Sequence, residues 1–330
     1  MKALVTGAGG FLGAALIRRL LSQGDKVRGL SRGDYPELAA LGAECVRGDV
    51  ADREAVSRAL AGCDVVFHTA GKVGLWGDYA DFERANVEGT RVLLEACREL
   101  NVPRFVFTGS PSVVFDGSNV AGWDESAPYP ARFDSFYSQT KAAAETLVLA
   151  ANGSKLKTVS LRPHLIWGPG DRHIAPRIIA RARAGKLMRI GDFNEKVDIT
   201  YIDDAVESHL LAASRLDGAL GVGGRAYFIS QGEPLPIWDV INGILAAAGL
   251  PPVTKRVPLA VARAVAWAME GAYRAFGVQQ EPRLTKFLVT QLTTAHWFDI
   301  GAARRDLGYQ PRVLFAEGLR RFSDSLKRVS

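Results

Sequence analysis

The stretch "VTGAGGFLGAAL", residues 5–16, decides how the beginning of this chain is interpreted. Its glycines Gly7, Gly10 and Gly13 stand between a short β-rich run and a run with helical periodicity. Glycines at this spacing permit a tight turn, close approach of a pyrophosphate to the backbone and close packing of the helix on a sheet. Backbone amides at the helix start, together with the helix dipole, would hold the diphosphate. The stretch predicts a dinucleotide-binding loop made by Gly7, Gly10, Phe11, Leu12 and Gly13.

Strand-like and helical runs alternate downstream of this loop. The strand-like runs are KALVTG, KVRGLSR, AECVRGDV, CDVVFHTAG, RFVFTGS and KTVSLRPHLIWG. Helical segments such as GFLGAALIRRLLSQG and NVEGTRVLLEACREL lie between them. Nearly continuous apolar strands alternating with amphipathic helices predict an α/β fold, with a Rossmann-type doubly wound parallel sheet that helices cover on both faces.

The regular alternation weakens after about residue 165, which indicates a second, smaller domain. We expect residues 1–165 to form a dinucleotide-binding Rossmann domain. The segments DITYIDDAVESHLLAASRL and RAYFISQ can add a helix and a strand to its sheet, so residues 198–231 are expected to return to it. Residues 166–197 and 232–330 are expected to form a smaller, mostly helical substrate-binding domain.

Composition and cysteine usage narrow the class of protein. The chain has 330 residues, of which 48% are hydrophobic and 23% are charged, as in ordinary globular proteins. Its three cysteines, Cys45, Cys63 and Cys97, are widely spaced and without neighbouring His, so neither a disulfide framework nor a metal site is indicated. This pattern favours the reducing cytoplasm. The first strand-like run begins at Lys2, so no signal or transit peptide is expected before it.

Two segments raise the question of a nucleic-acid or membrane partner. The formal net charge is +6, and its densest part is DRHIAPRIIARARAGKLMR, residues 171–189, where a solvated helix face is a commoner explanation than anion binding. The segment LAVARAVAWAMEGAYRAFG, residues 259–277, carries Arg263, Glu270 and Arg274 on one expected face, which is typical of an amphipathic helix. We expect this helix to be buried or to form a lid, with peripheral membrane contact as the minor alternative. No nucleic acid and no transmembrane segment are expected.

The end of the second strand bears on the choice between NAD and NADP. An acidic residue at this point would bind the ribose 2′-hydroxyl, whereas GLSRGDY offers Ser31 and Arg32, a hydroxyl and a guanidinium suited to a 2′-phosphate. This favours NADP. Asp34 follows shortly afterwards and keeps NAD possible.

The stretch DSFYSQTKAAAE, residues 134–145, places Tyr137 and Lys141 four positions apart on an expected helix. Residues i and i+4 lie above one another on a helix, so the two side chains can share one patch of space. A YxxxK pattern also arises by chance, and the simpler interpretation is an amphipathic helix with a packed Tyr and a solvated Lys. The pair gains meaning only from its context in the chain.

That context is a series of motifs in a fixed order. They are TGxxGxxG spacing at the first loop, GDV at Asp49, NVEGT at Asn86, FTGS at Ser110, YxxxK at Tyr137, and LRPHLIWGPGD in the sixth strand-like run and after it. Over nearly the whole chain they resemble the extended short-chain dehydrogenase/reductase superfamily. SPSVVFDG, DESAPYP and ARRDLGYQP are similar to its 3-beta-hydroxysteroid dehydrogenase branch, in particular to sterol-4-alpha-carboxylate 3-dehydrogenases and to 2-alkyl-3-oxoalkanoate reductases of bacterial olefin biosynthesis. The latter resemble the chain better at GKVGLWGDY, ISQGEPLP and QLTTAHWF, and they use NADPH.

By this resemblance, the catalytic trio of the family falls on Ser110, Tyr137 and Lys141. Tyr137 would act as the general acid, Lys141 would lower the pKa of Tyr137 and hold the nicotinamide ribose, and Ser110 would bind the reacting oxygen. Two positions depart from the family pattern. Gly109 stands where a second Ser or Thr is frequent, and HTAG, beginning at His68, replaces a motif that often ends in two alanines. We interpret His68 as a packing residue.

The remaining cofactor candidates are assigned by position in the same family. Residues Asp49 and Val50 are expected at the adenine, Ala70 and Gly71 along the cofactor, and Pro163 and His164 beside the nicotinamide carboxamide. Lys72 follows Gly71 and is included with them. Each of these residues is explained equally well by ordinary packing at a strand end. Asn86 is interpreted as structural.

The resemblance implies an NAD(P)-dependent oxidoreductase that interconverts an apolar 2-alkyl-3-oxoalkanoic acid and the 2-alkyl-3-hydroxyalkanoic acid with NADPH. Three alternatives stay open: a 3-beta-hydroxysteroid or sterol-4-alpha-carboxylate 3-dehydrogenase, a nucleotide-sugar epimerase or dehydratase, and a non-catalytic NADP-binding protein. The family also implies a cytoplasmic homodimer built from the helices near residues 86–100 and 137–150. A complex with other olefin-pathway enzymes is a further possibility.

A substrate of this kind places two demands on the site. A carboxylate beside the reacting carbonyl needs a cationic or hydrogen-bonding partner, for which Lys72, His164 and Arg172 are the candidates. The apolar remainder needs an apolar surface. Candidates for that surface, which core packing explains equally well, are Trp267, Met269, Phe276, Phe287 and Trp297.

Overall fold

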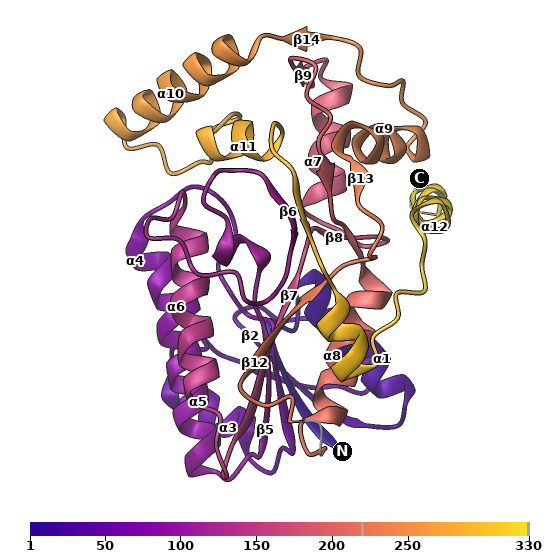
Figure 1. Ribbon diagram of the computed structural model, residues 1–330. Coiled ribbons are helices and arrows are strands. Elements are labelled where there is room, and N and C mark those ends of the chain that lie inside the picture. The colour runs from indigo at the N-terminus through magenta and orange to yellow at the C-terminus, as the bar shows by residue number, and fades with distance from the viewer. Residues whose placement is uncertain (219–220, 329–330) are drawn as a thin grey trace.

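The computed structural model describes residues 1–218 and 221–328 (Figure 1). Its largest element is a seven-stranded sheet in the order β12-β7-β5-β4-β1-β2-β3, with every neighbouring pair parallel. The strands are β1 (Lys2–Thr6), β2 (Lys26–Ser31), β3 (Glu44–Arg47), β4 (Val65–His68), β5 (Arg104–Thr108), β7 (Lys157–Pro163) and β12 (Arg225–Ile229). The strand order reverses between β1 and β4, which confirms the predicted doubly wound sheet.

Helices cover both faces of this sheet (Figure 1). On one face lie α3 (Arg53–Leu60), α5 (Gly89–Glu99) and α6 (Phe136–Ala150), and on the other lie α1 (Phe11–Ser22) and α8 (Ile202–Arg215). Successive residues of a strand point to opposite faces. Accordingly Leu4 packs in the cluster under α3 and α5, while Ala3 and Val5 pack in the cluster under α1 and α8. This two-sided burial explains the nearly continuous apolar strands of the sequence.

A second layer lies beyond the carboxyl ends of these strands (Figure 1). It contains a four-stranded sheet in the order β13-β10-β15-β6 and two short strand pairs, β11-β8 and β14-β9. Its strands are β6 (Val120–Trp123), β8 (Ile166–Trp167), β9 (Arg189–Ile190), β10 (Lys196–Val197), β11 (Thr200–Tyr201), β13 (Leu235–Pro236), β14 (Arg256–Val257) and β15 (His296–Phe298). Its helices are α7 (Ile174–Arg183), α9 (Ile237–Ala247), α10 (Leu259–Ala275), α11 (Lys286–Gln291) and α12 (Phe315–Lys327).

Short helical turns complete the described chain. They are α2 (Pro36–Ala40), α4 (Tyr79–Phe82), the π-helical turns η1 (Glu83–Glu88) and η3 (Ala303–Leu307), and the 3-10 turn η2 (Pro111–Val114).

The structure differs from the sequence prediction in two places that shape the site. The run KTVSLRPHLIWG was expected to be one strand, but it divides into β7 and β8 because Leu165 has a positive φ of 42°. Strand β6 lies within residues 1–165, yet it pairs with β15 in the smaller sheet. Strand β6 therefore contributes to the sheet of the second layer, although the residues around it belong to the layer of the large sheet.

The charged-face prediction for α10 is also wrong. Glu270 lies on the buried face of the helix with Ala262 and Ala266, where its carboxylate accepts a hydrogen bond from the amide of Lys286 at 2.7 Å. Arg263 and Arg274 are exposed, and so are large apolar side chains of this segment, including Trp267 at 71% and Phe276 at 83% exposure. Among the described residues, no helix is long and apolar enough to cross a membrane.

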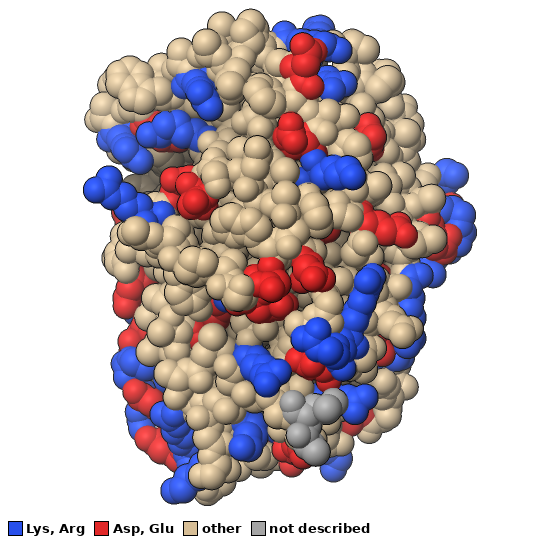
Figure 2. Space-filling model, in the orientation of Figure 1, with Lys and Arg blue, Asp and Glu red and all other residues tan. Residues whose placement is uncertain are grey.

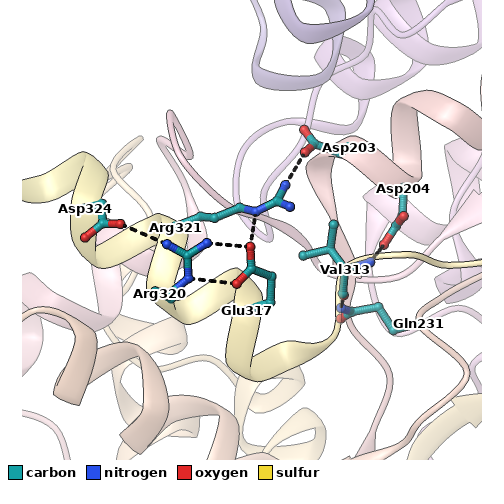
Figure 3. A network of polar contacts seen from close by, with 8 residues as sticks. All are labelled: Asp203, Asp204, Gln231, Val313, Glu317, Arg320, Arg321 and Asp324. Carbon is teal, nitrogen blue, oxygen red and sulfur yellow. Dashed lines mark hydrogen bonds and ion pairs between the residues drawn. The ribbon is translucent and has the colours of Figure 1, made fainter.

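A polar network joins the last helix to the large sheet's layer (Figure 3). The Asp204 carboxylate on α8 accepts hydrogen bonds from the amides of Arg312 and Val313 at 2.9 and 3.2 Å. The side-chain amide of Gln231 donates to the Val313 carbonyl, and Arg321 on α12 reaches Asp203 at 3.1 Å. These bonds fix the chain between η3 and α12 against α8, which holds the two layers together.

Acidic and basic side chains are interspersed on the face shown in Figure 2. A nucleic-acid surface would instead show a continuous basic patch or stripe. This face therefore offers no such footprint.

Candidate functional site

A cavity of about 1340 Å³ is lined by residues at the carboxyl ends of the parallel strands and by residues of the second layer. In doubly wound sheets, ligands bind at this edge, where the strand order reverses. The predicted catalytic and cofactor-binding residues all line it: Gly7, Gly10, Phe11, Leu12, Gly13, Ser31, Arg32, Asp49, Val50, Ala70, Gly71, Lys72, Ser110, Tyr137, Lys141, Pro163 and His164. The structure thus brings together residues that are spread over more than 150 positions of the sequence.

The glycine loop has the geometry that a dinucleotide requires. Gly7 has a φ of +66°, and its carbonyl accepts a hydrogen bond from the Gly10 amide at 2.8 Å, which closes the turn before α1. A Cβ at Gly13 would lie 2.3 Å from the Gly7 carbonyl oxygen. Only glycine fits this contact, and the residues at the start of α1 line the cavity that a diphosphate would enter. The residues present therefore fit a dinucleotide cofactor.

Ser110 and Tyr137 lie beside one another in this cavity. Ser110 follows β5, and its hydroxyl shares a hydrogen bond of 2.9 Å with the Ser112 hydroxyl. Tyr137 lies in the first turn of α6, which Ser135 caps by accepting a hydrogen bond from the Ser138 amide at 3.1 Å. Burial raises the pKa of Tyr137, while its hydrogen bond with Ser110 acts in the opposite direction. This arrangement keeps the phenol protonated and places two hydroxyls where one carbonyl oxygen can meet both.

The contacts of Lys141 differ from those that the family resemblance implies. Its ammonium group donates to the Thr108 carbonyl at 2.5 Å and lies 4.0 Å from the centre of the Phe107 ring. Burial lowers the pKa of Lys141 to about 7, although the negative charge of Glu145 raises it in part. The expected lowering of the Tyr137 pKa by Lys141 is not seen, since burial is the largest influence on both groups.

A buried ion pair one helical turn beyond Lys141 explains why residue 109 is a glycine. Glu145 is fully buried, and its carboxylate accepts from the Arg162 guanidinium at 2.6 Å and from the Ser160 hydroxyl at 2.6 Å. A Cβ at Gly109 would lie 2.9 Å from Glu145 Oε2 and 2.7 Å from Ser160 Oγ. The second Ser or Thr that the family often has at this position would collide with the Glu145 carboxylate, which accounts for the glycine.

Two histidines form a neutral pair at the substrate side of the cavity. His164 Nε2 and His296 Nδ1 are 2.7 Å apart, and His296 Nε2 is 2.9 Å from the Gln291 carbonyl oxygen. Burial is the main cause that lowers the pKa of His164 well below its usual value and that of His296 to about 4. A carbonyl only accepts, so His296 carries its proton on Nε2 and accepts at Nδ1 from His164.

Sequence reasoning placed two other polar residues in structural roles. His68 is buried, its ring nitrogens lie 2.7 Å from the Thr6 hydroxyl and 3.0 Å from the Thr90 hydroxyl, and burial lowers its pKa to about 3. The Asn86 side chain accepts from the Lys72 amide at 2.7 Å and donates to the Lys72 carbonyl at 3.2 Å. His68 therefore links β4 to β1 and α5, and Asn86 fixes the loop after β4 at Lys72.

The substrate surface was predicted less well than the cofactor surface. Of the five candidates for apolar contact, Phe287 lines the cavity, whereas Trp267 and Phe276 lie exposed on the outer side of the α10 segment. Sequence reasoning missed other lining residues, among them Tyr35, Thr69, Ser112, Phe115, His296 and Phe298. Tyr35 and Ser112 lie close in sequence to the predicted Arg32 and Ser110, which was an available signal. His296 and Phe298 reach the site only through the pairing of β15 with β6 and β10.

Comparison with known proteins gives matches over most of the chain. The pattern of the 3-beta hydroxysteroid dehydrogenase/isomerase family matches residues 4–260. A 2-alkyl-3-oxoalkanoate reductase of Shewanella oneidensis is 48% identical over 98% of this chain and 86% of that protein. A protein of the same description from Stenotrophomonas maltophilia is 47% identical over 98% of this chain and 99% of its own length.

Solved structures show the same architecture. The crystal structure of gox2253 has a TM-score of 0.79 and 27% identity, and the match covers 99% of this chain and 98% of that one. MoeE5 in complex with UDP-glucose and NAD has a TM-score of 0.77 and 26% identity, over 100% of this chain and 99% of its own. The fold around the cavity is therefore one that holds NAD in another protein.

Proposed function

The chain belongs to the 3-beta hydroxysteroid dehydrogenase/isomerase family, and from this premise we propose that it interconverts a 2-alkyl-3-oxoalkanoic acid and the 2-alkyl-3-hydroxyalkanoic acid with NADPH. At the level of the family, it is an NAD(P)-dependent oxidoreductase that acts on hydroxyl or keto groups. The observation that carries the proposed substrate is the near full-length similarity to two 2-alkyl-3-oxoalkanoate reductases. The shared cavity of Ser110, Tyr137 and Lys141 supports the chemistry.

The proposed reaction divides its work between the cofactor and the chain. Bound NADPH supplies the hydride that the carbonyl carbon receives. Tyr137, whose pKa is raised, holds the proton that the carbonyl oxygen needs, and its hydroxyl donates it as general acid. Ser110 hydrogen-bonds the same oxygen and fixes its position. Lys141 would bind the nicotinamide ribose and, with its pKa lowered to about 7, would return a proton toward Tyr137.

A direct assay tests this proposal. Purified protein is given NADP with a synthetic 2-alkyl-3-hydroxy acid or with a sterol bearing a 3-beta-hydroxyl, and NADPH formation is followed by absorbance. With a UDP-sugar, the epimer or the dehydrated sugar is followed by chromatography instead, because those reactions regenerate the cofactor and give no net NADPH. We expect turnover of the hydroxy acid and little with the other two. Preference for the sterol would favour a hydroxysteroid dehydrogenase instead, and preference for the UDP-sugar would favour the nucleotide-sugar enzymes.

The choice of NADPH over NADH is proposed from Arg32. The Ser31 hydroxyl already donates to the Gly33 carbonyl at 3.0 Å, whereas the Arg32 guanidinium makes no bond within the described residues and lines the cavity. Arg32→Ala should raise the Kd of NADPH about 10- to 150-fold, because a hydrogen bond to a charged group contributes about 1.5–3 kcal/mol. The Kd of NADH should change little.

Fluorescence titration of both cofactors measures this difference. Arg91→Ala is the matched control, since Arg91 pairs with Glu88 and Glu95 on α5 and does not line the cavity. Equal weakening of NADPH and NADH by Arg32→Ala would contradict the 2′-phosphate assignment.

We also propose, from the family resemblance, that two copies associate through α5 and α6. Leu94, an obvious site for a disruptive charge, is buried in the core of its own chain, so a charge there would unfold the protein. Ala143 lies on the exposed side of α6 and provides a better test. Sedimentation should show a dimer for the wild type and a monomer for Ala143→Glu. A monomeric wild type would end this proposal.

A further inference from the structure

Four acidic side chains line the cavity, and the structure gives each of them a partner. Asp49 pairs with Arg84 at 3.3 Å, Asp81 pairs with Lys72 at 2.6 Å, and Glu281 pairs with Arg177 at 2.9 Å. Asp171 accepts hydrogen bonds of 2.7–3.2 Å from the amides at the start of α7. Each of these carboxylates is therefore already paired with a group of the protein.

Most of the Lys and Arg side chains that line the cavity likewise have a partner within the protein. Lys72, Arg84 and Arg177 are the partners of those acids, and Lys141 donates to the Thr108 carbonyl. Among the described residues, two cavity-lining guanidinium groups make no ion pair or hydrogen bond: Arg32 and Arg172. Arg32 follows β2 in the cofactor half of the cavity. Arg172 follows β8 and precedes α7, in the layer that supplies the substrate side.

His164 is excluded as the partner of a substrate carboxylate by its hydrogen bond to His296. Because His164 donates through Nε2, its other ring nitrogen Nδ1 carries no proton and only accepts. A carboxylate also only accepts, so the two would repel rather than bind. Since His164 lines the cavity, its Nδ1 suits a donor instead, such as a hydroxyl or an amide.

We propose that Arg172 binds the carboxylate of the substrate. This inference rests on the proposed function, since it requires an acid substrate, and it narrows the three candidates Lys72, His164 and Arg172 to one. Lys72 would have to leave its ion pair with Asp81, and His164 presents an acceptor where a donor is needed. Arg172 has no ion pair or hydrogen bond among the described residues, and the carboxylate of its neighbour Asp171 is bound to backbone amides. A guanidinium group can bind a carboxylate through two parallel hydrogen bonds. Phe115, Phe287 and Phe298 line the same cavity and provide apolar surface for the alkyl chains.

The test compares an acid with its methyl ester. For wild type, Arg172→Ala and Arg172→Lys, kcat and KM are measured with a 2-alkyl-3-hydroxy acid and with its ester, together with the Kd of NADPH. The wild type should prefer the acid. Arg172→Ala should lower kcat/KM for the acid about 10- to 150-fold, mainly through KM, and leave the ester unchanged, so that the preference disappears. Arg172→Lys should keep part of the acid preference, because lysine has the positive charge but lacks the planar guanidinium that forms two parallel hydrogen bonds.

Arg183→Ala is the matched control, since Arg183 is an exposed arginine of α7 outside the cavity and should leave the acid preference intact. The inference is overturned if Arg172→Ala keeps the wild-type preference, if the wild type does not distinguish acid from ester, or if the variant instead weakens NADPH binding. Failure of the wild type to turn over either compound would overturn the proposed function itself. An unchanged Kd for NADPH shows that the variants are folded.

Discussion

Tyr137→Phe is expected to lower kcat for the 2-alkyl-3-hydroxy acid by about 10²–10⁴, the range that a positioned general acid or base contributes. The aromatic ring remains, so its packing in the first turn of α6 should persist and the Kd of NADPH should stay nearly constant. Only the hydroxyl that lies beside Ser110 is lost. Steady-state kinetics and fluorescence titration on the same preparation separate the two quantities.

Tyr79→Phe is a matched control for this substitution. Tyr79 is exposed in α4, outside the cavity, with its ring against Phe136, so removal of its hydroxyl should leave kcat unchanged. If Tyr137→Phe retained near-normal activity, another group would have to supply the proton and the proposed role of Tyr137 would be wrong.

The cofactor side of the site could be predicted from the sequence because its signals are local. One signal is the turn that contains Gly7, Gly10 and Gly13. The other is a single helix face that carries Tyr137 and Lys141. Each signal needs only a short stretch of chain whose conformation is set by its own residues. The same holds for the apolar strands that form the sheet, since burial on both faces leaves a continuous pattern.

The substrate side could not be predicted because it depends on contacts between distant segments. The His164–His296 pair joins residues 132 positions apart, and the Arg177–Glu281 pair joins two segments of the second layer. Neither pair leaves a periodic pattern in the sequence. Glu270 was misplaced for the same reason. Helical periodicity assigned it to the charged face of its helix, but its carboxylate accepts a hydrogen bond from the distant Lys286 amide, which stabilises it in the interior. Partners of this kind decide which charges remain free for a ligand.

The pair of Glu145 and Arg162 is the most deeply buried ion pair among the described residues, and Glu145 lies one helical turn from Lys141. Nearby hydrogen bonds from Ser160 at 2.6 Å and Tyr129 at 2.7 Å satisfy the remaining acceptors of the Glu145 carboxylate. Arg162 is the chief cause that holds the pKa of Glu145 below its usual value against the effect of burial. Removal of Arg162 would leave this charge in the interior without its counterion.

Arg162→Met should therefore lower the free energy of unfolding by about 3–5 kcal/mol, the usual cost of breaking a buried pair from one side. Urea denaturation at neutral pH measures this loss. Arg225→Met is the control, because Arg225 pairs with Asp306 at an exposed position and should change stability by less than about 1 kcal/mol. The double variant Glu145→Leu/Arg162→Met should be more stable than Arg162→Met alone, since it removes the uncompensated charge and leaves apolar side chains in its place. If the double variant were no more stable, lost packing of the arginine side chain rather than an unpaired Glu145 would explain the effect.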